Sequence, residues 1–285
     1  DDAIGGLCNA NHLGAEANLA TALLDDLGVL LRHGEIVDNP GIRRPQPLNP
    51  RSMGLVLGDL LCGDPDQPGH TVGHTTAVQL FKPGQLPLAG SLLDHFYEVG
   101  GNCLDTAHVY RCEETVGEWI RLRGVREQLV VIGKGARDAA GTPSGLTLQL
   151  LETLDKMQLD YLDIYLMHTD NPSVPVGEFV DCLNAHRNAG RIRAFGGSNW
   201  SLERLDGANE YARAHGLTGF AASSPNLSLA AWNEPMWPGC LTASDSGSRD
   251  WYARTGMPLF AWSSQATGLF SGRYKPEDRD KTGLE

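Results

Sequence analysis

Short apolar runs alternate with helical patterns along this chain, and that alternation limits its fold more than any other feature. Residues 146–157 carry apolar side chains at i, i+4 and i+8, residues 176–189 precede a capping glycine, and Ser201 is typical of a helix N-cap. Because parallel strands need crossover helices, the alternation predicts an α/β fold with a parallel sheet covered by helices. The expected strands are 53–58, 102–106, 128–133, 163–168, 192–197, 219–223 and 257–262.

Four ionisable residues lie at or just beyond the ends of these apolar runs: Asp105, Tyr110, Lys134 and His168. The carboxyl ends of barrel strands are where a (β/α)8 fold carries its chemistry. A nearby ammonium group lowers the pKa of a phenol, whose usual value is about 10. Each residue alone has an ordinary structural explanation, such as a cap or a packed aromatic ring. Their combination predicts a proton-transfer site.

The pattern Asp105-Thr-Ala-x-x-Tyr110, followed by Lys134 and His168, resembles the Asp–Tyr–Lys–His tetrad of the aldo-keto reductases. The likeness continues in residues 189–199, which are similar to the family's Gly-x-Ser-Asn signature, and in residues 257–274. It covers roughly residues 52–275. The resemblance implies a (β/α)8 TIM barrel that reduces an aldehyde or ketone to an alcohol with NAD(P)H, or runs the reverse reaction.

The resemblance also implies a role for each member of the tetrad. Tyr110 would be the general acid and base at the carbonyl oxygen. Lys134 would favour the phenolate, Asp105 would hold Lys134 in place, and His168 would orient the carbonyl. A Schiff base on Lys134, as in an aldolase, is an alternative use of that residue.

The cofactor residues come from the same likeness, because no Gly-x-Gly-x-x-Gly follows a strand. Ser198 and Asn199 match positions that bind the carboxamide, Trp262 matches the aromatic residue that stacks on nicotinamide, and Ser263 matches a pyrophosphate contact. Ser224 stands where the family has a glutamine, so that contact is expected to be weaker or water-bridged. The family favours NADP, with NAD as the alternative.

Three tryptophans on loops after the fifth and sixth expected strands, Trp200, Trp232 and Trp237, are candidates for the substrate pocket. Flat aromatic walls suit sugar-derived or aromatic carbonyl compounds, and packing is an equally good explanation for these side chains. A barrel that binds the nicotinamide cofactor as a sensor or regulatory subunit, with little turnover, is the second functional hypothesis.

Two departures from the family concern domain organisation. Residues 51–285 are expected to form the barrel, with an insertion at residues 59–87, but the eighth strand–helix unit is not visible in the sequence. Residues 1–50 are interpreted as a helical N-terminal extension, or as the permuted last strand–helix unit. A seven-stranded barrel would leave unpaired edges, which is why the second interpretation is considered.

The bulk properties exclude several partners. The net charge of −12 argues against nucleic acid and anionic membranes, and no apolar run is long enough for a membrane span. The six scattered cysteines indicate reduced thiols, and the N-terminus lacks a secretory pattern, so a cytoplasmic location is expected. No metal site is expected, and the predicted partner is a small carbonyl compound or alcohol.

Overall fold

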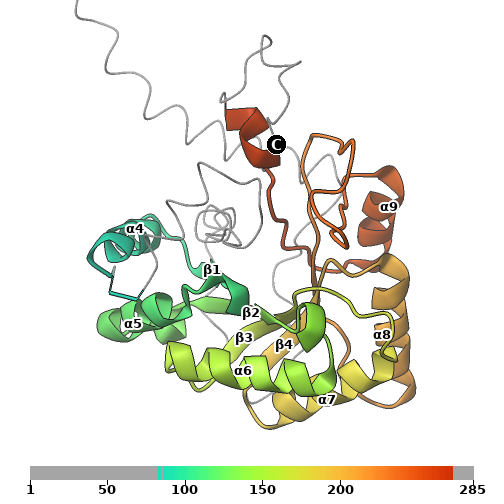
Figure 1. The fold of residues 1–285 in the computed structure, drawn as a ribbon, viewed down its shortest axis with the longest axis horizontal. Coiled ribbons are helices and arrows are strands. Elements are labelled where there is room, and N and C mark those ends of the chain that lie inside the picture. Colours follow the sequence, from blue (N-terminus) through green and yellow to red (C-terminus); the bar gives the residue numbers. More distant parts are fainter. Residues whose placement is uncertain (1–82, 85, 272–285) are drawn as a thin grey trace, which may run out of the picture.

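The computed structural model describes residues 83–84 and 86–271. Five parallel strands form one sheet whose spatial order follows the sequence, β1-β2-β3-β4-β5 (Figure 1). The predicted strand at 53–58, residues 1–50 and nearly all of the predicted insertion at 59–87 lie outside the described residues. The strands are β1 (Cys103–Asp105), β2 (Val130–Gly135), β3 (Leu162–Met167), β4 (Ile192–Ser198) and β5 (Ala222–Ser224).

Helices connect the strands and cover the outer side of the sheet. Figure 1 shows α5, α6, α7 and α8 following one another along that side. The longest, α6, begins after Thr142, whose hydroxyl accepts the Gly145 N–H, and its C-cap Gln158 lies in the left-handed region. The helices are α4 (Leu86–Glu98), α5 (Glu113–Arg123), α6 (Pro143–Met157), α7 (Val176–Asn188), α8 (Leu202–Ala214) and α9 (Ser246–Thr255), with 3-10 turns η2 (His108–Tyr110), η3 (Arg126–Gln128), η4 (Asp138–Ala140) and η5 (Ala266–Ser271).

Most expected elements are present, with shifted ends. The expected N-cap is confirmed, because Ser201 accepts the Arg204 N–H at the start of α8. Strand β2 starts and ends two residues later than predicted, since residues before it form η3, so Lys134 lies within the strand. The expected strand 257–262 makes only isolated parallel bridges to Ser223 and Asn226. Pro225 and Pro258 have no N–H to give to a ladder, which limits pairing there.

The two faces of the sheet differ in composition. The outer face and the helices share the main hydrophobic core, which includes Leu104, Val131 and Phe195. The inner face carries a smaller cluster of Ile132, Leu166 and Ala222. The chain in this region is therefore part of a barrel of parallel strands with outer helices, and closure into eight strands stays a prediction. Among the helices of residues 86–271, none is long and apolar enough to cross a bilayer.

Candidate functional site

Successive residues of a strand alternate between its two faces, so every second side chain near the carboxyl end of a strand lies on the inner face of the sheet. Ile132 belongs to the inner cluster, and Lys134 follows it at the next inward position of β2. Asp105 is paired in register with Ile132, at the end of β1. Lys134 is only 3% exposed, and its ammonium group forms an ion pair with the Asp105 carboxylate. The structure thus joins two of the four predicted residues in an ion pair, in which Lys134 is buried and Asp105 is partly buried.

Tyr110 comes to this pair from the turn that follows β1. The ring lies at the end of η2, where Arg111 takes a left-handed conformation with φ of 57° and redirects the chain into α5. The ammonium of Lys134 lies 5.2 Å from the centroid of the Tyr110 ring. The structure therefore places a positive charge against the Tyr110 ring.

His168 completes the group from the end of β3. Its backbone N–H donates to the Gly135 carbonyl at 2.6 Å, and its ring meets the Tyr110 ring edge-on, with centroids 5.6 Å apart. Burial, and then the positive charges of Lys134 and Arg137, hold the pKa of His168 well below its usual 6.5. Within the described part of the chain, no hydrogen-bond partner reaches its buried Nδ1. The Nδ1 atom of this neutral imidazole is therefore suited to form a hydrogen bond with a ligand.

Ser198 and Asn199 lie beside His168 at the end of β4. The Asn199 amide donates to the His168 carbonyl at 3.2 Å and to the Ser198 hydroxyl at 3.2 Å, so both of its protons are used. Its oxygen accepts the Leu241 N–H and keeps one lone pair. The Ser198 hydroxyl donates to the carbonyl of Ser224, at the end of β5. These predicted cofactor residues therefore form one buried network, which also tethers the loop containing Leu241.

The aromatic residues separate into two groups. Trp262 stacks on Trp237 with ring centroids 4.7 Å apart and lies 5.9 Å from the Trp232 ring. Ser263 follows Trp262 with a positive φ of 51°. Trp200 is only 2% exposed and packs in the hydrophobic core, with its ring 4.9 Å from Phe220. The position of Trp200 corrects its assignment to the substrate pocket, because a side chain packed on the outer face of the sheet does not face the barrel mouth.

Sequence reasoning did not single out His108, although the structure brings it into contact with charged residues of α6. Its Nε2 lies 2.7 Å from a Glu152 carboxylate oxygen and 3.3 Å from the Lys156 ammonium. The sequence signal for this charged helix face is the i, i+4 spacing of Glu152 and Lys156, which places both side chains on one face of α6. Burial raises the pKa of the Cys103 thiol to about 12, so this thiol stays protonated.

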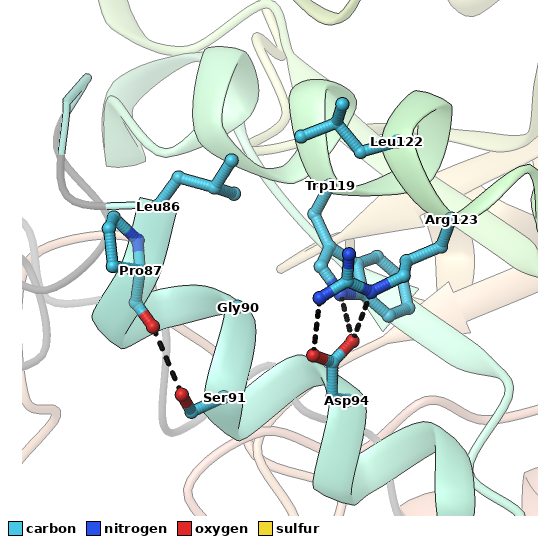
Figure 2. Close-up of a pocket in the computed structure, with 8 residues that line it drawn as sticks. All are labelled: Leu86, Pro87, Gly90, Ser91, Asp94, Trp119, Leu122 and Arg123. Atoms are coloured by element: carbon cyan, nitrogen blue, oxygen red, sulfur yellow. Dashed lines mark hydrogen bonds and ion pairs between the residues drawn. The ribbon is translucent and has the colours of Figure 1, made fainter.

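A small crevice of about 200 Å³ lies between α4 and α5, and none of the four predicted tetrad residues lines it. Figure 2 shows Asp94 of α4 directed at Trp119 and Arg123 of α5. The carboxylate accepts the Trp119 indole N–H at 2.8 Å and two hydrogen bonds from Arg123. Arg123 and then Trp119 hold the pKa of Asp94 at about 2. The polar groups in this crevice thus satisfy one another across a helix–helix contact.

The chain is similar in sequence to known proteins. The sequence profile of the aldo/keto reductase family matches residues 82–284. Norsolorinic acid reductase B of Aspergillus parasiticus is 31% identical over 223 residues, which cover 72% of this chain and 55% of that protein. Aryl-alcohol dehydrogenase [NADP(+)] of Phanerodontia chrysosporium is 27% identical over 213 residues, covering 67% and 52%. The chain therefore spans about half the length of these curated relatives.

A solved structure supports the fold alone. A crystal structure described as that of a 2,5-diketo-D-gluconic acid reductase B superposes with a TM-score of 0.50 at 24% identity. The superposition covers 63% of this chain and 58% of the other.

Proposed function

The chain belongs to the aldo/keto reductase family of oxidoreductases, and from that premise we propose that it uses NADPH to reduce an aromatic aldehyde or ketone to the alcohol, with Tyr110 as the general acid. The observation that carries the proposal is the convergence of Asp105, Lys134, Tyr110 and His168 in one corner, where Lys134 and His168 are buried and the other two partly buried. The reverse oxidation would use the same groups, with Tyr110 as the base.

The residues in this corner fit a nicotinamide cofactor. Among the described residues, no hydrogen-bond partner reaches the His168 Nδ1, and the Asn199 oxygen accepts the Leu241 N–H alone, which leaves a lone pair that could accept a carboxamide N–H. Ser198, Asn199, Ser224, Trp262 and Ser263 are the proposed cofactor-binding residues. NADPH is proposed ahead of NADH because one relative carries NADP(+) in its name.

The bound nicotinamide would supply the hydride to the carbonyl carbon, and the protein would supply the proton. As negative charge grows on the carbonyl oxygen, the Tyr110 hydroxyl donates its proton to that oxygen. Lys134 stabilises the resulting phenolate, and its ion pair with Asp105 holds the ammonium near the ring. His168, held neutral by burial, donates a hydrogen bond that orients the carbonyl.

An aromatic substrate is proposed from the indole cluster. Trp237 stacks on Trp262 with their planes 24° apart, and Trp232 is tilted by 42° from Trp262, so three indole rings gather beside the proposed nicotinamide position. Aromatic rings gain from packing on other aromatic rings beyond the burial of area. The names of the relatives, an aryl-alcohol dehydrogenase and a norsolorinic acid reductase, support the same class.

The proposal predicts that Tyr110→Phe lowers kcat by roughly 100-fold to 10,000-fold, the usual contribution of a positioned acid. The affinity for NADPH should stay nearly unchanged. Measurement combines fluorescence titration with NADPH and NADH and a steady-state assay on a panel of aromatic and sugar-derived carbonyl compounds. His215→Gln, at the exposed end of α8, is the matched control and should keep full activity.

Two results would contradict this proposal in different ways. Binding of NADPH without turnover on any carbonyl compound, insensitive to Tyr110→Phe, would favour a sensor. Turnover without either cofactor, with a Lys134 adduct trapped by borohydride, would favour a Schiff-base enzyme.

A further inference from the structure

A cluster of charged side chains lies outside the proposed site, where α5, α6 and the turn η2 meet. Glu113 stands at the first position of α5, while Glu152, Thr153 and Lys156 come from the C-terminal half of α6. His108 reaches the cluster from η2. The mechanism proposed above uses none of these residues.

The cluster is costly to bury, so its arrangement needs a physical reason. Glu113 is only 1% exposed, and burial raises the pKa of its carboxyl group, against the opposing effects of Thr153, Lys156 and His108. Thr153 donates to one oxygen of Glu113 at 2.6 Å, and the Lys156 ammonium lies 3.7 Å from the other. Buried charges are retained when they are paired, and removing one partner leaves the other uncompensated. The pairs here join α5, α6 and η2 into one unit.

The turn that carries Tyr110 has little internal support. It has three residues, and the Tyr110 N–H donates to the Ala107 carbonyl at 2.9 Å. Ala107 provides no side-chain cap, and Arg111 leaves the turn in a left-handed conformation. Short 3-10 turns have poor hydrogen-bond geometry, so contacts from outside must set their orientation.

His108 is such a contact, and it lies two residues before Tyr110. Its Nε2 can donate to Glu152 or accept from Lys156, but cannot do both. The 2.7 Å distance to Glu152 is the shorter of the two, which favours Nε2–H donating to the carboxylate. The ring is half-buried against α6, so a rotation of η2 would break this bond.

We propose that His108, held by its hydrogen bond to Glu152 of α6, is a positioning residue that fixes the Tyr110 hydroxyl relative to Lys134 and His168. The inference rests on the proposed function only in treating Tyr110 as the acid. A displacement of about 1 Å at a reacting group can lower a rate by roughly 100-fold, so a small tilt of η2 would suffice.

The test compares His108→Leu, which removes the hydrogen bond, with His108→Gln, whose amide can still donate to Glu152. Full-length protein with 13C-labelled tyrosine rings is used, and Tyr110→Phe identifies the Tyr110 signal. His108→Leu and Glu152→Leu should each shift or broaden that signal and lower kcat roughly tenfold or more, with the NADPH dissociation constant within about twofold of wild type. His108→Gln should restore both the signal and most of kcat.

Arg123→Leu is the matched control, because it removes a comparable ion pair between α4 and α5 that is remote from η2. It should leave the Tyr110 signal and kcat unchanged. An unchanged Tyr110 signal in His108→Leu would overturn the inference, as would equal shifts of all tyrosine signals. A selective Tyr110 shift in a protein that reduces no carbonyl compound would support the positioning role and contradict the proposed function instead.

Discussion

At the scale of single residues, burial decides how His168 can act. A histidine in water would change charge near pH 6.5. Here burial and the positive charges of Lys134 and Arg137 oppose protonation, so the imidazole stays neutral through physiological pH. A neutral ring can donate one hydrogen bond and accept another, whereas an imidazolium beside Lys134 would add a second positive charge to the corner.

This environment predicts a pH dependence of stability. Because the folded-state pKa of His168 is lowered, the unfolded chain binds more protons, and stability falls as pH drops below about 6.5. His168→Gln should remove that loss, so the free energy of unfolding of wild type relative to the variant should decrease from about pH 8 to about pH 5. Urea unfolding of both proteins across this range measures the difference. A constant difference would contradict the prediction.

At the scale of elements, close helix packing depends on one glycine of α5. A Cβ at Gly117 would collide with the backbone of Met157 at the end of α6. The same contact includes Arg121 of α5, whose guanidinium donates to the Met157 carbonyl at 2.8 Å. Since α5 follows the Tyr110 turn and α6 carries Glu152, the approach of these helices also bears on the proposed site.

We predict that Gly117→Ala lowers the free energy of unfolding by about 1–3 kcal/mol, as overpacking of a close contact does. Gly207→Ala, in the middle of α8 with open space around the added methyl group, should instead raise it by about 0.5–1 kcal/mol. Chemical denaturation of both variants tests the pair. Equal effects of the two substitutions would show that helix propensity, not the α5–α6 contact, decides the outcome.

At the scale of the whole molecule, the barrel brings together residues that are far apart in the chain. Strands β1 to β5 contribute Asp105, Lys134, His168, Ser198 and Ser224 to the same end of the sheet. A ligand that bridges several strand ends binds the folded state and not the unfolded chain. Its binding should therefore stabilise the whole molecule.

NADPH at about 100 times its dissociation constant should raise the free energy of unfolding by about 2.7 kcal/mol. For a chain of this size that corresponds to a rise in Tm of about 5–10 °C. Thermal unfolding with NADPH and with NADH measures both binding and preference, and Tyr110→Phe should keep the shift. No shift with either cofactor would contradict the proposed cofactor role, independently of any activity assay.

The sequence alone determined the strand–helix alternation and the family, because periodicity and ordered motifs are local signals. It also placed Asp105, Lys134 and His168 near the ends of strands, and the observed ends of these strands lie within two residues of the expected ones. Tertiary structure decided what depends on which face a side chain occupies. Trp200 and Trp262 look alike in sequence, yet one packs in the core and the other stacks in an aromatic cluster. His108 had no distinguishing pattern, and only the approach of α6 to η2 brings it to Glu152, since contacts between distant segments follow from packing and not from spacing.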